Sequence, residues 1–309
     1  MVDEPIQGEP LSAAPRVASR PAGVPGRAAV ADAIADDLPV TLIRPSRGWQ
    51  SLGWDDLWRY RELLYFLTWR DVKVRYKQTV LGVAWAVIQP VMATVVFALF
   101  FGKLAGLSQS TEVPYPLFVY AAILPWTFFA EAVSQASQSL IASANLLTKV
   151  YFPRLIVPAA SVAGLLVDLA ISLVVMGCLL VGYGVWPGPN VFLLPLMVIA
   201  TVLTTLGVGT LLAALTVAYR DFRYVVPFLL QIWLFASPVV YGFDKIPPRW
   251  QLVYALNPMA GIIDGFRSAL LGQPLRGTCI GVSLAVAVIL FYVGTVYFRR
   301  SERRFADIV

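Results

Sequence analysis

Few residues in this sequence have side chains that could carry out chemistry within its apolar stretches. Asp168 and Glu131 are two carboxylates inside such stretches, and there a carboxylate either serves a transport path or pairs with a neighbouring helix. The chain has no histidine, and its two cysteines, Cys178 and Cys279, both lie in apolar segments. We therefore predict no catalytic residue and no metal site. Because no Lys, Arg or His lies in these stretches to complete a proton relay, helix pairing is favoured for Asp168.

A basic run, RDVKVRYK, holds the cations Arg70, Lys73, Arg75 and Lys77. In a helix over residues 54–78, most of these cations follow one stripe, and aromatic and apolar residues form the neighbouring stripe. Such a moderately amphipathic helix can lie in a membrane interface with its cations in water. These cations suit the phosphate groups of a lipid carrier, but they suit an anionic membrane leaflet equally well.

The composition indicates a membrane protein. Hydrophobic residues make up 58% of the chain and charged residues 14%, whereas soluble domains average about 45–50% and about 25%. The mean hydropathy is +0.72. The first 40 residues lack the apolar core of a signal peptide. The net charge of +6 is not gathered on a soluble face, so we expect no nucleic-acid partner.

The fold class that follows is an all-α polytopic membrane protein. A helix needs about 20 mostly apolar residues to cross a bilayer, and six segments qualify as candidates: 81–102, 115–137, 157–183, 191–217, 225–243 and 278–298. The expected domain organisation is a disordered tail over 1–45, an interface helix over 54–78, a transmembrane domain over 81–298 and a cytoplasmic tail over 299–309.

The distribution of Lys and Arg predicts the orientation. With the N-terminus inside, most cations that flank the candidate spans fall on the inner side, as the positive-inside rule expects. Both termini are therefore predicted to be cytoplasmic. The outer side then carries a small set: Lys103, Lys245, Arg249, Arg267 and Arg276.

The stretch after the fifth candidate span, 244–277, is too short and too interrupted to cross. It predicts two short helices, Trp250 to Leu256 and Met259 to Leu271, which Asn257-Pro258 separates and Gly272 ends. A pair of half-length apolar helices suggests a re-entrant hairpin. We interpret it as an outer gate with Trp250, Pro258, Phe266 and Arg267 as its candidate residues, and a static surface cap is the alternative.

Two inner loops are candidates for contact with a partner. The first, SANLLTKVYFPRLIVP, predicts a short helix with an apolar knob that the cations Lys149 and Arg154 flank. The knob comprises Leu146, Leu147, Val150 and Tyr151. An exposed apolar knob usually docks into another surface, although packing beneath the membrane is the alternative. The second loop holds Arg220 and Asp221, which could serve the same contact or only anchor the helix ends at the interface.

Aromatic residues form the last candidate group. Trp126 in the second span and Trp233 in the fifth lie deeper than an interfacial belt would, and Phe129 and Phe235 are the lining candidates beside them. Flat rings can stack on the apolar faces of sugars without strong directionality, so a path lined by rings would suit a long glycan. Core or lipid-facing packing is the alternative at each position.

No phosphate-binding loop of the GxxxxGK[ST] type occurs in the chain. Five motifs nevertheless appear in a characteristic order: RDVKVRYKQTVLGVAWAVIQP, SANLLTKVYFPRLIVP, YRDFRYVVPFLLQIW, SPVVYG and NPMAGIIDGFRSALLG. In this order they resemble the motifs of ABC-2 type transmembrane permeases of polysaccharide export. The O-antigen exporter membrane subunits (Wzm-type) are the most similar branch, with teichoic-acid and capsule export permeases as relatives. The resemblance covers about residues 57–300.

The resemblance implies an inner-membrane homodimer of six-span subunits with two copies of a P-loop ABC ATPase. This chain would bind no cofactor, because ATP and Mg would reside on the ATPase. The cargo would be a lipid-linked polysaccharide, with O-antigen on undecaprenyl diphosphate expected first. Residues 143–154 would be the coupling helix that contacts the ATPase, and the loop 219–224 would lie near that contact. Membrane lipids would surround the homodimer.

Other readings remain open at this point. The alternatives within the family are export of teichoic acid, of capsular polysaccharide, or of a small lipid or drug. A membrane glycosyltransferase would need acid/base or metal-binding groups such as a DxD motif, which the chain lacks. A proton-driven transporter would need inverted repeats and midplane charges, and no convincing repeat is seen.

Overall fold

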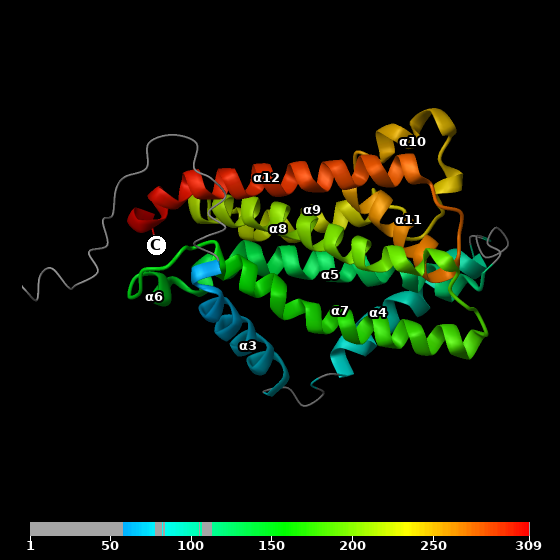
Figure 1. Cartoon of the computed structure of the whole chain (residues 1–309), viewed down its shortest axis with the longest axis horizontal. Coiled ribbons are helices and arrows are strands. Elements are labelled where there is room, and N and C mark those ends of the chain that lie inside the picture. Colours follow the sequence, from blue (N-terminus) through cyan, green and yellow to red (C-terminus); the bar gives the residue numbers. More distant parts are fainter. Residues whose placement is uncertain (1–57, 78–81, 83, 105, 107–112, 309) are drawn as a thin grey trace, which may run out of the picture. The chain divides into compact units, whose positions relative to one another are not determined.

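The structure is a computed structural model and describes residues 58–77, 82, 84–104, 106 and 113–308. Every regular element in those ranges is a helix (Figure 1). The all-α prediction is therefore confirmed for the described part of the chain. The tail predicted over 1–45, and the first residues of the helix predicted over 54–78, lie outside the described residues.

The interface and membrane helices follow the order expected from the hydropathy. In chain order the elements are α3 (Arg61–Lys77), α4 (Ala84–Phe97) with its π-helical extension η1 (Ala98–Leu104), α5 (Tyr115–Ala142), α6 (Ala144–Leu147), α7 (Ile156–Tyr183), η3 (Pro189–Leu193), α8 (Leu194–Ala218), α9 (Phe222–Phe235), η4 (Phe243–Lys245), α10 (Pro248–Tyr254), α11 (Pro258–Leu271) and α12 (Gly277–Ile308).

Within the residues that the structure describes, five helices are long and apolar enough to cross a membrane: Ala84–Gly102, Tyr115–Ala142, Ile156–Tyr183, Pro189–Ala218 and Gly277–Glu302. The remaining predicted span, the fifth (225–243), is not one long helix. Its helix α9 has 14 residues, about 21 Å at 1.5 Å per residue, against a hydrocarbon core of about 30 Å. The chain leaves the helix after Phe235 and turns through 236–242, where Pro238 removes a backbone donor.

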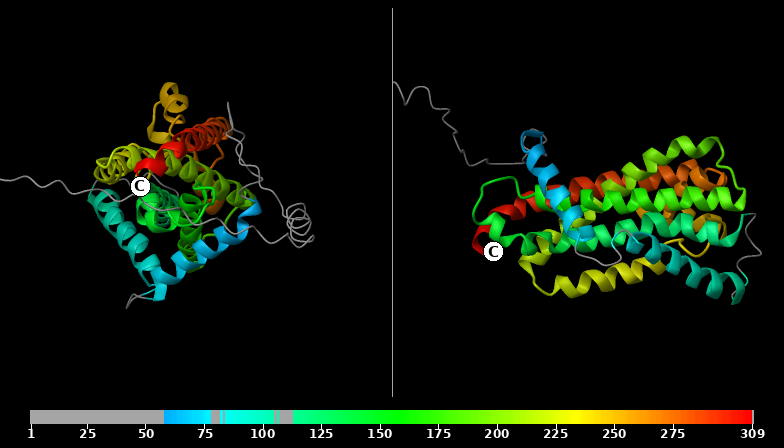
Figure 2. Two further views of the ribbon diagram at one scale, coloured as in Figure 1. Left: turned by 90° about the vertical axis from the view of Figure 1, so that its left-hand side faces the viewer. Right: turned by 90° about the horizontal axis from the view of Figure 1, so that it is seen from below.

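α5 forms the centre of the bundle. It packs against α7, α8 and α11, and also against α4 and α9. Figure 2 shows the long helices gathered around it. Most of its side chains are buried, including Phe118, Tyr120 and Phe129. Residues that α5 carries are therefore in a position to contact most other elements of the bundle.

α8 and α12 cross at unusually close range because both contribute glycine. A Cβ added at Gly207 would lie 2.6 Å from the carbonyl carbon and oxygen of Leu290. Small residues at such crossings allow the backbones of membrane helices to approach closely. The close contact fixes the register between α8 and α12.

The bundle has two distinct ends (Figure 1). The short helix α6 and the C-terminal part of α12 lie at one end, and α10 and α11 lie at the other. α12 continues as a helix through 299–308, so the segment expected as a tail after residue 298 extends the last span.

α3 lies obliquely to the long helices (Figure 2) and packs on α7. Leu67 is buried, whereas Tyr65, Phe66 and Trp69 are exposed. Large exposed rings beside cations suit the boundary between lipid and water.

Candidate functional site

An ion-pair cluster joins α3 to the membrane helices. Arg75 and Tyr76 of α3 both donate hydrogen bonds to Asp168 of α7, and Arg75 Nη2 donates to Gln135 Oε1 of α5 at 2.6 Å. Burial, followed by the bond to Asp168, raises the pKa of the Tyr76 hydroxyl. The prediction that Asp168 bonds a neighbouring helix is confirmed, and its partners are residues that the sequence analysis did not pair with it.

This cluster lines a cavity of about 110 Å³ between α3, α4, α5 and α7. At about 10–15 Å³ for each water, several waters fit. Its ionisable lining includes Arg75, Asp168 and Glu131, which is two carboxylates against one guanidinium. A site with this charge balance disfavours phosphate. The geometry therefore gives Arg75 a pairing role, and it does not support the interpretation of Arg75 as a phosphate ligand.

The other three cations of the basic run remain on the surface of α3. Arg70 bonds its neighbour Asp71 through Nε at 3.0 Å and Nη2 at 2.8 Å. Lys73 and Lys77 are exposed. These three positions are accessible to a lipid headgroup or to another protein.

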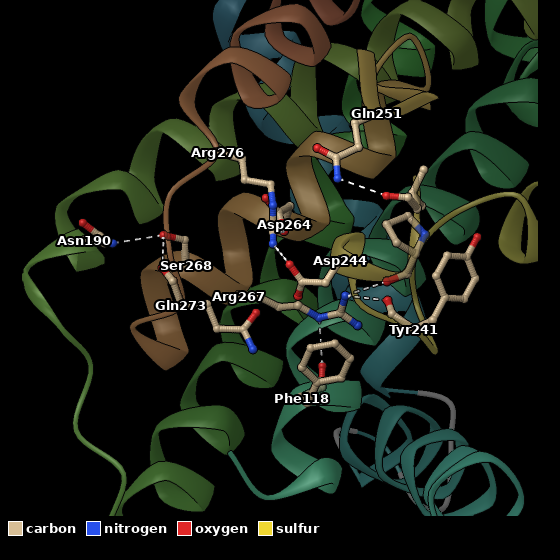
Figure 3. Close-up of polar contacts among 12 residues, drawn as sticks. Phe118, Asn190, Tyr241, Asp244, Gln251, Asp264, Arg267, Ser268, Gln273 and Arg276 are labelled. Atoms are coloured by element: carbon tan, nitrogen blue, oxygen red, sulfur yellow. Dashed lines mark hydrogen bonds and ion pairs between the residues drawn. The ribbon is translucent and has the colours of Figure 1, made fainter. Parts of the chain in front are cut away.

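At the opposite end of the bundle, Arg267 of α11 is 1% exposed. Its guanidinium donates to the carbonyl of Phe118 at 3.2 Å, of Pro238 and Val239 at 2.7 Å each, and of Tyr241 at 3.1 Å (Figure 3). It also stacks 3.5 Å from the centre of the Phe118 ring. The cation thus supplies donors to three carbonyls of the non-helical turn that follows α9, and to one of α5.

Arg276 forms a second charged contact beside it (Figure 3). It pairs with Asp264 Oδ1 of α11 at 3.0 Å and also with Asp244 of η4. The orientation prediction counts both Arg267 and Arg276 on the outer side, and the structure places their side chains within the packing of this end.

Asn257 organises the joint between α10 and α11. Its side chain accepts from the Met259 amide at 3.1 Å, which caps α11. The same oxygen accepts from Trp233 Nε1 at 2.9 Å, and its amide nitrogen donates to Ser237 Oγ at 3.0 Å. The sequence analysis treated Asn257-Pro258 only as a helix boundary, although an Asn before a helix is also a capping signal.

The four predicted gate residues lie in different environments. Pro258 begins α11, and Phe266 and Arg267 are fully buried in it. Trp250 is exposed on α10. The helix pair matches the predicted boundaries closely, including Gly272, whose φ of 68° is the left-handed conformation that ends α11.

The predicted channel aromatics mostly pack inside the subunit. The Phe129 ring lies 5.6 Å from that of Trp126 and 5.1 Å from that of Trp233. Trp126 and Phe129 are buried, Trp233 is partly buried, and Phe235 is 62% exposed. For Trp126 and Phe129 the structure supports the alternative of core packing, because neither ring reaches a surface that cargo could touch. Of the four predicted channel aromatics, Phe235 is the one whose ring is largely exposed.

The predicted coupling segment is shorter and less uniform than expected. The helix α6 ends at Leu147, so Val150 and Tyr151 do not continue its face. Leu146 and Leu147 pack partly against an inner cluster around Leu140, whereas Tyr151 is 83% exposed. The interpretation of one apolar knob is therefore corrected to an inward pair and an outward ring, with Lys149 exposed between them.

A contact with α12 anchors this segment, between residues that lie 148 positions apart in the sequence. Glu302 of α12 accepts from the Arg154 amide at 3.0 Å, and its carbonyl accepts from Arg154 Nη1 at 2.8 Å. Arg220 and Asp221 are exposed in the turn between α8 and α9, at the same end of the bundle (Figure 1). The accessible surface of this end thus combines Tyr151 with the charges of the α8–α9 turn.

Comparison with known proteins shows which family shares this architecture. The ABC-2 type transporter family profile matches residues 62–271. The chain is 31% identical over 82% of its length to the O-antigen export system permease protein RfbA of Myxococcus xanthus, covering 97% of that protein. It is 29% identical to the RfbA protein of Klebsiella pneumoniae, over 80% of this chain and 95% of that one.

A more distant relative is the polysialic acid transport protein KpsM of Escherichia coli, which is 18% identical over 75% of this chain and 91% of that protein. The family match covers α3 to α11, which includes the ion-pair cluster, the coupling segment and the buried arginine. The chain therefore belongs to the ABC-2 type transporter family, as a multi-pass membrane permease that works with an ABC ATPase.

Proposed function

We propose that this chain is the membrane subunit of an exporter that moves O-antigen, carried on undecaprenyl diphosphate, across the inner membrane. The observation that carries the proposal is the 31% identity to an O-antigen export permease over 97% of that protein's length. The similarity to the polysialic acid transport protein is lower, so capsule export is supported less.

The proposed assembly is a homodimer with two copies of a P-loop ATPase, which supplies ATP and Mg. The absence of a phosphate-binding loop in the sequence supports this division of labour. In each subunit α9, the turn 236–242 and the α10–α11 pair together make the fifth of six crossings, before α12. Irregular backbone is tolerated at membrane depth only where protein covers it, and the carbonyl contacts of Arg267 meet that condition.

In this proposal the end that carries α6 faces the cytoplasm, together with both termini, and the α10–α11 pair faces the periplasm. Closure of the ATPases on ATP pushes on Tyr151 and on the turn with Arg220 and Asp221. The motion passes to α5 and α7 on either side of α6, and through Arg154 to α12. α3 lies on the inner leaflet with Lys73 and Lys77 toward anionic phosphate groups.

The glycan path lies between the two copies. Phe235 is the aromatic of the predicted set that is available to line it, because its ring is exposed in the single subunit. Trp250 on α10 is available at the outer opening. The hydrogen bonds of Asn257 and Arg267 support movement of the α10–α11 pair and the end of α9 as one unit.

The experiment that tests this function has two parts. The mass and composition of the particle purified in mild detergent should correspond to two permeases and two ATPases. In a strain that lacks its own O-antigen permease, the pair should restore glycan at the cell surface. A particle without an ATPase would refute the assembly, and surface capsule without O-antigen would refute the cargo.

A further inference from the structure

A groove of about 300 Å³ lies between α3, α5 and α7. Its lining includes Arg70 and Asp71 from α3, Gln138 and Ser139 from α5, and Ser161 from α7, together with apolar residues such as Leu67. It is separate from the smaller cavity beside Asp168, and no role proposed above uses it.

The charges of this groove are balanced and adjacent. Among the residues that line it, Arg70 and Asp71 are the ionisable ones, and their side chains are 45% and 30% exposed. They bond each other through two contacts. A neutral pair of opposite charges, partly open to solvent, complements a ligand that carries one negative and one positive group close together.

The remaining lining provides neutral hydrogen-bonding groups. Ser139 and Ser161 donate to carbonyls of their own helices, which leaves their oxygens as acceptors. The Gln138 side chain makes no hydrogen bond with any residue in the described ranges. A partly buried amide with unused donor and acceptor capacity favours a polar occupant in the groove.

The position of the groove indicates where that occupant comes from. Trp69 precedes Arg70 on α3 and is 57% exposed, and Tyr65 and Phe66 are also exposed one turn earlier. Exposed rings of this kind lie at headgroup depth in a bilayer. The groove therefore opens where lipid headgroups are concentrated.

The geometry points to a binding site for a phosphoethanolamine headgroup, with its phosphate on Arg70 and its primary ammonium on Asp71. An ammonium with three donors can bond the Asp71 carboxylate and the serine oxygens, which a quaternary choline cannot do. An anionic headgroup would satisfy Arg70 but would face the Asp71 carboxylate. The site is independent of the exported cargo.

The test measures lipid retention by the full-length purified chain with native mass spectrometry. The probes are phosphatidylethanolamine, its mono-, di- and trimethylated forms and phosphatidylglycerol, all with the same acyl chains. We expect retention to fall along the methylation series to about one tenth, as expected for one lost charge-assisted hydrogen bond. Phosphatidylglycerol should bind no better than the choline form. Equal retention of all headgroups would overturn the proposal.

Variants assign the two charges. Asp71→Asn should abolish the preference for ethanolamine over choline, and Arg70→Gln should weaken retention of both. Arg61→Gln, at an exposed position of the same helix that does not line the groove, is the matched control and should change neither. The exposed pair contributes little to folding, so all three variants should fold. A preference that survives in Asp71→Asn would refute the assignment.

Competition with soluble glycerophosphoethanolamine tests whether the headgroup or the acyl chains hold the bound lipid. Displacement of the bound lipid by this compound, but not by glycerophosphocholine, is expected because the headgroup carries the recognition. Lipid that resists both compounds and is retained whatever its headgroup would show that acyl chains alone hold it, and would overturn the proposal.

Discussion

At the scale of single residues, this protein keeps its charges by pairing them inside the bundle. Arg267 bonds four backbone carbonyls while it is 1% exposed. Arg75 and Asp168 neutralise each other between α3 and α7. In both cases the charge is tolerated because hydrogen bonds replace the water that burial removes.

Replacement of Arg267 should destabilise the fold severely. Arg267→Met leaves the carbonyls of Pro238, Val239 and their neighbours without donors, at about 1–3 kcal/mol for each one that stays unsatisfied. We expect loss of most folded protein, measured as monodisperse yield and melting midpoint in detergent. The yield and melting midpoint of Arg267→Lys should lie between those of the native protein and those of Arg267→Met, because an ammonium can bond fewer of these carbonyls than a guanidinium. The exposed Arg249→Met is the control, and equal yields for both methionine variants would contradict this role.

The Arg75–Asp168 pair should behave as a coupled unit. Arg75→Gln and Asp168→Asn each leave one charge without its partner and should lower the melting midpoint by several degrees. The double variant removes both charges and should recover part of that loss. A double-mutant cycle on thermal stability measures the coupling, and strictly additive losses would show that the ion pair contributes nothing.

At the scale of elements, close crossings and short helices determine what each segment can do. α8 and α12 approach through Gly207, and α9 ends after 14 residues because the chain turns before Pro238. α6 has only four residues, so the segment that follows it presents Tyr151 outward rather than as part of a helical face.

A methyl group at the α8–α12 crossing should be costly. Gly207→Ala places a Cβ 2.6 Å from the Leu290 carbonyl, which forces the two backbones apart and should lower the melting midpoint. Gly281→Ala on α12 meets no atom within 4 Å and is the control. It should be neutral or slightly stabilising, because Ala favours helices over Gly. A tolerated Gly207→Ala would show that the crossing adjusts freely.

Tyr151 should separate coupling from folding. Because its side chain is 83% exposed, Tyr151→Asp should leave the melting midpoint unchanged while it reduces ATPase co-purification and export. Tyr151→Phe retains the ring and should retain both ATPase co-purification and export. Leu147→Asp is a poorer test, since Leu147 packs against the inner cluster and its loss would also unfold the segment. Normal export by Tyr151→Asp would remove this residue from the coupling surface.

At the scale of the whole molecule, the bundle has one end with α6 and the C-terminal part of α12 and another with α10 and α11 (Figure 1). α12 runs between them. Once one end is located on one side of the membrane, the side on which each loop lies follows from this arrangement.

The orientation can be tested with single cysteines in a background of Cys178→Ser and Cys279→Ser. Asp244→Cys lies at the α10–α11 end with its side chain 75% exposed, and a membrane-impermeant maleimide should label it in intact spheroplasts. Tyr151→Cys should react only after the membrane is opened. The reverse pattern would invert the proposed topology.

The sequence alone determined the features that depend on neighbouring residues. Hydropathy identified the membrane class and the long spans, and the Asn-Pro and Gly signals bounded α11, because span length and helix ends are local properties. The ordered motifs identified the family, which the comparisons confirm. The prediction of one continuous span over 225–243 was wrong, because α9 ends at Phe235. Composition alone does not show where an apolar segment stops being helical.

Only the tertiary structure decided which charges are paired and which rings are covered. Arg75 meets Asp168 across 93 residues of sequence, and Arg267 meets Phe118 across 149. Such partners depend on how separate helices pack, which no local pattern encodes. The same reason applies to Phe129, whose ring is buried by Trp126 and Trp233, and to Tyr151, which is exposed because α6 ends early.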